Sequence, residues 1–226
     1  MNTPLAGKRI LITQASEFMG PTLCEMLAEQ GASVIASHES LAPVDAAARV
    51  VAAAGHIDIL IANLAIGAPT TLALEVEEPE WREVFATLVD PLPRLARAVL
   101  PAMLERRAGK ILVMGSASAL RGMKRCSTYS AARGAQLAWV QALGVEVASQ
   151  QVQVNAVAQV FVENPTYYPP ALQANPKFQE RISREVPLGR LVGAREDGAF
   201  VAYLCSDAAN CFVGQVFPMA GGWVTR

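Results

Sequence analysis

The sequence predicts a single α/β domain with a doubly wound, Rossmann-like parallel sheet. Short apolar runs alternate with longer segments whose apolar residues have helical spacing, which is typical of β-α-β units around a buried parallel sheet. The 226 residues are 52% hydrophobic, which is enough for one sizeable core covering residues 1–226. Gly31, Gly55 and Gly109 lie where three predicted helices turn into strands.

Six apolar runs are expected to form the strands of the sheet. They cover Arg9–Thr13, Ser33–Ser37, Ile57–Ala62, Lys110–Gly115, Gln153–Ala158 and Gln215–Pro218. Right-handed crossovers between parallel strands place the ligand crevice of such a sheet at the carboxyl ends of the strands.

Most of the segments between the strands are expected to be helical. Three of these helices matter below, and they cover Pro43–Ala54, Pro79–Leu104 and Ser127–Gln150. Pro79 suits a first helical turn, whereas Pro91 and Pro93 should kink the helix that contains them. The proline-rich segment Val162–Asn175 is expected to be an irregular loop, and a loop of that length in a compact domain is usually functional.

Composition and charge narrow the partners and the compartment. The formal net charge is -1 and the basic residues are scattered, so we expect a small-molecule substrate and neither nucleic acid nor a membrane as partner. The four cysteines have no CxxC spacing and there are only two histidines, so no metal site is expected. The amino-terminal segment lacks the features of a signal peptide, and no apolar run reaches the length of a membrane span, which predicts a cytoplasmic protein.

The residues most informative about chemistry are Ser116, Tyr129 and Arg133. Ser116 follows a predicted strand, at the edge where ligands bind in this fold, and could hydrogen-bond a substrate oxygen. Tyr129 and Arg133 are four residues apart on one predicted helix, so their side chains share a face. A guanidinium beside a phenol should lower the Tyr129 pKa from about 10 toward neutrality and make it a general base. The spacing alone also fits a packed tyrosine and a solvated arginine.

Together with other motifs, these residues resemble the short-chain dehydrogenase/reductase superfamily, which pairs such a serine with a Tyr-x-x-x-Lys motif. The resemblance covers essentially the whole chain and implies the superfamily's fold. The further matches are Asn63, the strand before Gly115-Ser116, Val154–Val157, Pro187–Arg190, and Gly214-Gln215 with Gly221-Gly222.

Several departures from the superfamily affect its nicotinamide site. Arg133 replaces the lysine that holds the nicotinamide ribose. The glycine-rich turn that admits the pyrophosphate reads Thr13–Gly20 here and keeps only Gly20. Glu17 and Phe18 would place a carboxylate and a ring where phosphates and nicotinamide belong.

Three more departures point the same way. About 20 residues separate the second and third predicted strands and hold one helix, so one strand–helix unit of the superfamily is missing. Gln159-Val160 replaces a Pro-Gly pair that contacts nicotinamide, and Asp90 replaces an asparagine of the dehydrogenases' proton relay. We therefore expect the chain to use no cofactor.

Ser116, Tyr129 and Arg133, combined with the spacing Thr13-x4-Phe18-x-Gly20, resemble the halohydrin dehalogenases. This resemblance implies reversible conversion of a vicinal haloalcohol into an epoxide, halide and a proton, and ring opening by azide, cyanide or nitrite. By the same resemblance, the halide would be bound by Phe18, Gln159, Val160, Phe161, Val162 and Tyr167. The substrate pocket would be bounded by Ala65, Ile66, Ser118, Met123 and Tyr168.

The family resemblance also implies a homotetramer assembled through the two long helices. Two other functions stay open. One is an NAD(P)H-dependent reductase with a variant Tyr-x-x-x-Arg pair, which tight dinucleotide binding would reveal. The other is a non-catalytic binding protein on the same fold, which an ordinary Tyr129 pKa would favour.

Overall fold

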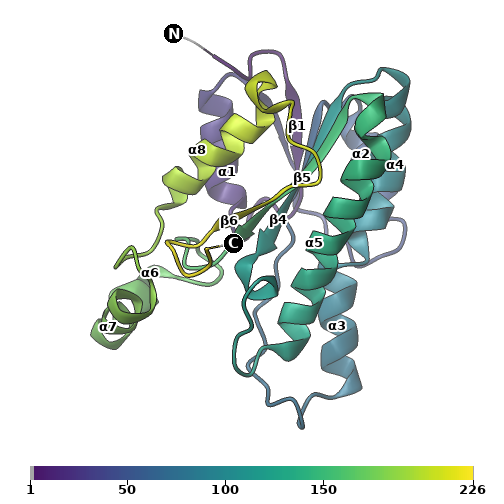
Figure 1. The fold of residues 1–226 in the computed structure, drawn as a ribbon. Coiled ribbons are helices and arrows are strands. Elements are labelled where there is room, and N and C mark those ends of the chain that lie inside the picture. Colours follow the sequence, from purple (N-terminus) through teal and green to yellow (C-terminus); the bar gives the residue numbers. More distant parts are fainter. Residues whose placement is uncertain (1–2, 226) are drawn as a thin grey trace.

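The computed structural model of the chain describes residues 3–225 and consists of a six-stranded parallel sheet covered by helices on both faces (Figure 1). The strand order is β2-β1-β3-β4-β5-β6. The strands are β1(Arg9–Ile12), β2(Ser33–Ala36), β3(Ile59–Ala62), β4(Gly109–Ser116), β5(Val152–Gln159) and β6(Val216–Met219). The predicted doubly wound sheet of six strands is confirmed, with each strand within about two residues of its expected bounds.

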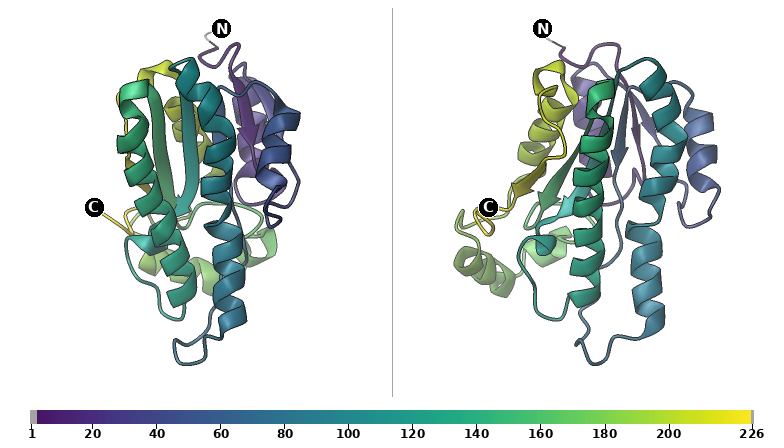
Figure 2. Two further views of the ribbon diagram at one scale, coloured as in Figure 1. Left: turned by 90° about the vertical axis from the view of Figure 1, so that its right-hand side faces the viewer. Right: turned by 45° about the vertical axis from the view of Figure 1, so that its right-hand side comes forward.

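Two helical layers flank the sheet, as Figure 2 shows. One layer holds α1(Gly20–Glu29) and α8(Ala194–Cys205), and the other holds α2(Ala46–Ala54), α4(Pro91–Glu105) and α5(Ser127–Val147). Successive residues of a strand point to opposite faces. Ile10 and Ile12 accordingly pack under α1 and α8, whereas Leu11 belongs to the apolar cluster under α2, α4 and α5.

The long helix expected over Pro79–Leu104 is two helices, α3(Glu78–Leu88) and α4. They are separated at Val89 and Asp90. Pro91 lacks an N–H and its ring clashes with the preceding turn, so it begins a new helix instead of kinking the old one. Pro93 lies in the first turn of α4, where a missing N–H costs nothing.

The expected loop Val162–Asn175 is partly helical, which corrects the prediction. It contains α6(Pro170–Gln173) and leads into α7(Pro176–Glu185). Each helix starts on a proline, and Asn175 caps α7 by accepting a hydrogen bond from the Lys177 N–H at 2.9 Å. The two helices lie beyond the carboxyl edge of the sheet, at the lower left of Figure 1.

The remaining short elements are three 3-10 turns. They are η1(Ala117–Ala119), η2(Ala148–Gln150), which ends the helix expected to reach Gln150, and η3(Asp207–Ala209). One helix, α2, connects β2 to β3, as expected from the short spacing.

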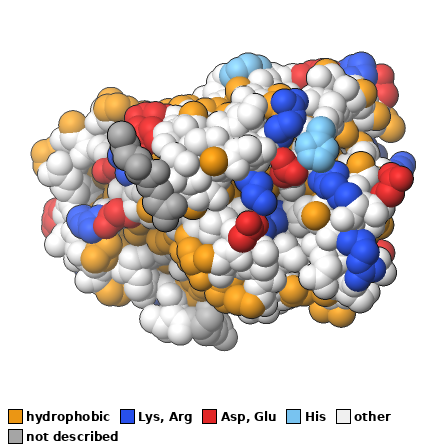
Figure 3. All heavy atoms as spheres, turned by 90° about the horizontal axis from the view of Figure 1, so that it is seen from above, with side chains coloured by type: hydrophobic (Ala, Val, Ile, Leu, Met, Phe, Trp, Pro, Cys, Tyr) orange, Lys and Arg blue, Asp and Glu red, His pale blue; other side chains and the backbone are white. Residues whose placement is uncertain are grey.

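The end of the molecule opposite α7 carries basic and acidic side chains in close alternation (Figure 3). The pair Lys8–Asp207, at 3.1 Å, is an example. Among residues 3–225, no helix combines the length and apolar character that crossing a bilayer requires. The four cysteines are all free thiols.

Candidate active site

Segments that follow different strands meet at the carboxyl edge of the sheet around a cavity of about 300 Å³. Phe18 comes from the turn after β1, Ser116 ends β4, Tyr129 lies on α5 and Gln159 ends β5; all four line the cavity. Ser116 and Gln159 are direct neighbours in the β4–β5 ladder. The parallel topology therefore brings together residues that are up to 141 positions apart, from Phe18 to Gln159.

Ser116 is held by its own turn. Its Oγ lies 2.9 Å from the Oγ of Ser118 and accepts a hydrogen bond from the Ser118 N–H at 3.2 Å. The preceding Gly115 lets α5 approach closely, because a Cβ there would lie 2.9 Å from the Leu137 side chain. This close approach is what places Tyr129 beside the end of β4.

Arg133 is a fully buried cation with no carboxylate partner among residues 3–225. One guanidinium nitrogen donates to the Met114 carbonyl at 3.0 Å and to Gln136 Oε1 at 2.9 Å, and the other donates to the Tyr167 hydroxyl at 3.1 Å. Burying a charge without a counter-ion is costly, so this arrangement favours an anion nearby. Gln136 lies three residues after Arg133, a helical spacing that could have identified it from sequence.

The Tyr167 hydroxyl connects Arg133 to Tyr129. It accepts a hydrogen bond from the Tyr129 hydroxyl at 3.1 Å and donates to the Ile66 carbonyl at 2.9 Å. Arg133 itself lies over the Tyr129 ring, 5.1 Å from its centroid. Arginine and tyrosine thus share a helix face as expected, but the hydrogen bond from the guanidinium goes to Tyr167.

The expectation of a lowered Tyr129 pKa is wrong for this structure. Burial raises the pKa of Tyr129 well above its usual value, and the opposing effect of Arg133 is too small to reverse the shift. The neighbouring Tyr167 raises that pKa further. At neutral pH, Tyr129 is therefore a phenol.

The turn after β1 is filled by side chains. Asn63 holds it by donating from Nδ2 to the carbonyls of Gln14 and Glu17, each at 3.0 Å. Phe18 has a φ of +50°, donates its N–H to Thr166 Oγ1 at 2.6 Å, and packs edge-on against Tyr167 at 5.3 Å. Positive φ at a non-glycine residue stores strain of a kind common at functional sites.

This turn does not fit the dinucleotide that the superfamily's fold implies. The Phe18 ring is buried, and the Glu17 carboxylate accepts a hydrogen bond from the Thr166 hydroxyl at 3.1 Å where a pyrophosphate would need donors. Gly20 is retained for a local reason, because a Cβ there would lie 2.5 Å from the Ala15 carbonyl oxygen.

The predicted halide-binding residues all line the cavity. Two of the expected backbone donors are already used: the Val160 N–H donates to the Met219 carbonyl at 3.1 Å, and the Phe161 N–H donates to the Tyr168 hydroxyl at 3.3 Å. Phe161 has a φ of +56°, which turns the chain sharply after β5. The long Phe161–Tyr168 hydrogen bond is the one that an incoming anion could most easily replace.

The substrate end of the cavity differs from the prediction. Met123 and Tyr168 line it, whereas Ala65, Ile66 and Ser118 are not among its lining residues. Ser118 is hydrogen-bonded behind Ser116, and Ile66 contributes its carbonyl to Tyr167. Sequence reasoning did not assign eight wall residues to the site, several of them on α6, α7 and their flanks: Ala68, Thr70, Gly115, Cys126, Asn164, Leu172, Phe178 and Arg181.

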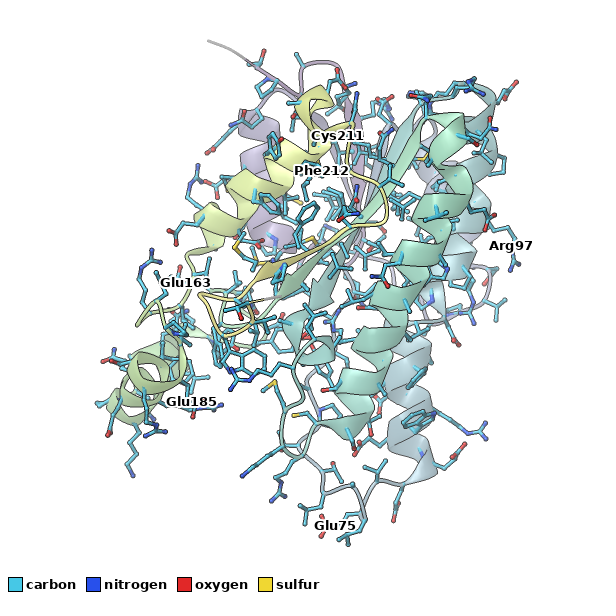
Figure 4. All side chains as sticks on the ribbon, in the orientation of Figure 1. Glu75, Arg97, Glu163, Glu185, Cys211 and Phe212 are labelled. Carbon is cyan, nitrogen blue, oxygen red and sulfur yellow. The ribbon has the colours of Figure 1, made fainter. Side chains whose placement is uncertain are left out.

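The first part of the loop from β5 to α6 is held by hydrogen bonds of Asn164 and Glu163. Asn164 donates from Nδ2 to the Val162 carbonyl at 2.7 Å and accepts from the Tyr167 N–H at 2.8 Å, which places the Tyr167 ring. Glu163, labelled in Figure 4, accepts a hydrogen bond from the Ala194 N–H at 3.3 Å and so ties the loop to the start of α8.

Comparisons with known proteins agree on the fold and differ on the activity. A family model described as enoyl-(acyl carrier protein) reductase matches residues 6–224. The 3-oxoacyl-[acyl-carrier-protein] reductase of Salmonella typhimurium is 31% identical over 241 residues, covering 96% of this chain and 97% of the relative.

Two solved structures are similar over almost the whole chain. One, described as a dehalogenation enzyme, has a TM-score of 0.92 and 34% identity and covers 99% of this chain and all of its own. The other, a halohydrin dehalogenase bound to ethyl (2S)-oxiran-2-ylacetate, has a TM-score of 0.88 and 27% identity, with 97% and 99% covered.

Proposed function

The chain belongs to the short-chain dehydrogenase/reductase superfamily, and we propose that within it the protein acts as a cofactor-independent halohydrin dehalogenase. It would convert vicinal haloalcohols into epoxides with release of halide and a proton, and would open epoxides with small anions such as azide, cyanide or nitrite. The similarity to two dehalogenase structures supports this proposal.

One observation carries the proposal: within the described residues, Arg133 is a buried cation that pairs with no carboxylate, is hydrogen-bonded to one phenol and lies over the ring of another. Such a charge stabilises a phenolate or a bound anion, and both occur in this reaction. The reaction's proton acceptor is a phenolate and its product is a halide.

In the proposed reaction, Ser116 and Tyr129 hold the substrate hydroxyl at the end of β4. The Tyr129 phenolate takes the hydroxyl proton, the oxygen attacks the adjacent carbon, and the carbon–halogen bond breaks with both electrons leaving on the halide. Phe18 and the turn Val160–Val162 would hold the departing anion, because ring edges and backbone N–H groups suit a large, weakly hydrated ion.

The raised Tyr129 pKa sets the direction of the pH dependence. Dehalogenation needs the phenolate, which becomes more abundant as pH rises toward that pKa. Ring opening needs the phenol, which donates its proton to the epoxide oxygen and predominates at neutral pH. We therefore propose that dehalogenation accelerates with pH from neutral to alkaline conditions, while ring opening does not.

The rival function is reduction with NAD(P)H, which the reductase names of the sequence relatives favour. The filled turn at Phe18 and the Glu17 carboxylate count against it. A non-catalytic role would leave Arg133 buried without any function for its charge.

The deciding experiment measures chloride release and acidification from 1,3-dichloro-2-propanol without added cofactor. We expect release by the wild type, loss of release in Tyr129→Phe, and full activity in the control Tyr203→Phe, which changes an exposed tyrosine on α8. Saturable NAD(P)H binding without chloride release would overturn the proposal in favour of a reductase. Inactivity without dinucleotide binding would favour a binding protein.

We also propose a homotetramer assembled through α3, α4 and α5. Trp81 on α3 and Val145 on α5 are exposed apolar side chains on these helices, 42% and 75% accessible. Light scattering on the purified protein tests this, and a monomer would contradict it.

A further inference from the structure

A pair of polar side chains is buried in the apolar layer between the sheet and α8. Asp197 lies in the first turn of α8 and is fully buried, and Gln159, the last residue of β5, is 4% exposed. Among residues 3–225, neither carboxyl oxygen of Asp197 and neither amide atom of Gln159 makes a hydrogen bond of normal geometry. The Gln159 amide nevertheless lies close enough to lower the Asp197 pKa, so each is the other's polar neighbour.

In the part of the chain that the structure describes, no basic side chain forms an ion pair with Asp197. The basic residues of α8 and of the loop before it pair with other acids: Arg195 with Glu25 and Glu29, and Arg190 with Glu196. Two further titratable groups lie nearby. Glu163 accepts a hydrogen bond from the Ala194 N–H, and Cys24 on α1 is a free thiol. Burial raises the pKa of Asp197 to about 7, with Gln159 opposing the shift. The first-turn position of Asp197, which favours a negative charge, does not offset this burial.

Gln159 connects this pair to the candidate active site. It lines the cavity, neighbours Ser116 in the β4–β5 ladder, and leads directly into the turn Val160–Val162 at the anion end of the cavity. A contact that orients the Gln159 side chain therefore also positions the end of β5, where that turn begins.

We propose that Asp197 is a positioning residue for the anion end of the cavity: as a neutral acid it anchors Gln159 and permits anion binding, and as a carboxylate it weakens anion binding. This inference rests on the proposed function, because it assumes that an anion binds at Phe18 and Val160–Val162. Asp197 does not line the cavity and takes no part in the chemistry.

The two protonation states of Asp197 differ in hydrogen bonding and in charge. The neutral acid donates its O–H to the Gln159 amide oxygen, whereas the carboxylate can only accept from the amide nitrogen, so the amide must turn over between the states. The carboxylate also adds an unscreened negative charge near the anion. At an effective dielectric constant near 20, a like charge roughly 10 Å from an anion weakens its binding by roughly tenfold or more.

The test uses sodium bromide as the probe, titrated calorimetrically at constant ionic strength near pH 5.5 and near pH 8.5. In the wild type, we expect the bromide Kd to be about tenfold higher at the alkaline pH. Ionisation of Tyr129 does not contribute to the pH dependence of the bromide Kd, because burial raises the Tyr129 pKa above this pH range.

Asp197→Asn keeps a donor, its side-chain N–H, for the Gln159 amide oxygen and cannot ionise, so its Kd should match the wild type at low pH and stay there at high pH. Asp197→Val removes the anchor, so its Kd should be raised equally at both pH values. Asp207→Asn changes an exposed acid shortly after α8 and should retain the wild-type pH dependence.

A wild-type Kd that does not change with pH overturns the inference without requiring any variant, and so does an unchanged pH dependence in Asp197→Asn. In both cases bromide still binds, and the proposed function stands. Failure of the wild type to bind bromide at either pH would overturn the inference and the proposed anion site together.

Discussion

Two ionisable side chains are buried on opposite faces of the same sheet. Their surroundings allow one of them to keep its charge and make the other neutral. Arg133, on the α5 face, reaches three hydrogen-bond acceptors and two aromatic rings, and its pKa is raised despite burial, through the effects of Tyr129 and Tyr167. Asp197, on the α8 face, has one amide beside it and is neutral up to about pH 7. A buried group keeps its charge only where hydrogen-bond partners replace the lost water.

The largest expected effect is on the rate of dehalogenation and comes from removing the positive charge of Arg133. Arg133→Met should lower dehalogenation by about 10⁴-fold, because the Arg133 guanidinium is the neighbouring group that lowers the Tyr129 pKa and so favours the phenolate. It should also leave the Met114 carbonyl and the Gln136 amide without their donor, at about 1–3 kcal/mol of stability. Chloride release and urea unfolding measure the two effects. Near-normal activity in a folded Arg133→Met protein would refute the role of the cation.

The next largest effect is on the pH dependence of stability and comes from Asp197, the buried acid that is neutral in the fold up to about pH 7. Asp197 has a folded-state pKa of about 7 against 3.8 when unfolded, so between these values only the unfolded chain is ionised. The free energy of unfolding of the wild type should therefore fall as pH rises from about 4 to about 7, by roughly 4 kcal/mol in total from this group. Urea unfolding should show this slope reduced in Asp197→Asn. Equal slopes in the two proteins would mean that Asp197 ionises in the fold as freely as in the unfolded chain.

A smaller effect is expected from the link between the arginine and the catalytic phenol. Tyr167→Phe removes the hydroxyl that joins Arg133 to Tyr129, and loss of one such hydrogen-bonded bridge should reduce kcat by about tenfold. Tyr203→Phe is the control, because its exposed hydroxyl contacts the Ala208 carbonyl and lies outside the cavity wall. If Tyr167→Phe is as active as Tyr203→Phe, Tyr167 only packs the loop.

The smallest effect concerns the ring beneath the proposed anion site. Phe18→Leu keeps an apolar side chain but removes the ring edge and the contact with Arg133, whose guanidinium lies 5.7 Å from the ring centroid. We expect bromide affinity to fall by about threefold, as suits a single weak ion–ring contact. Calorimetry at one pH measures it, and unchanged affinity would place the anion away from Phe18.

The sequence was most informative where a local pattern is sufficient. The six strands follow from apolar runs, and the positions of Ser116, Tyr129 and Arg133 follow from a strand end and a four-residue helical spacing. It was least informative about α6, because a helix of four residues among prolines is too short to show a periodic apolar pattern. The break at Asp90 was predicted only as a kink, since the sequence shows that Pro91 disturbs a helix but not how far the next one turns away.

The sequence by itself determined the fold class and the elements on which the proposed catalytic residues lie, because burial periodicity and turn chemistry are local properties. Only the tertiary structure decided that Tyr167 stands between Arg133 and Tyr129, and that Gln159 meets Asp197. Both contacts join residues that are more than thirty positions apart in the chain. The tertiary structure also determines the direction of the Tyr129 pKa shift. Burial raises this pKa by more than the nearby Arg133 lowers it, and residue spacing in the sequence does not reveal burial.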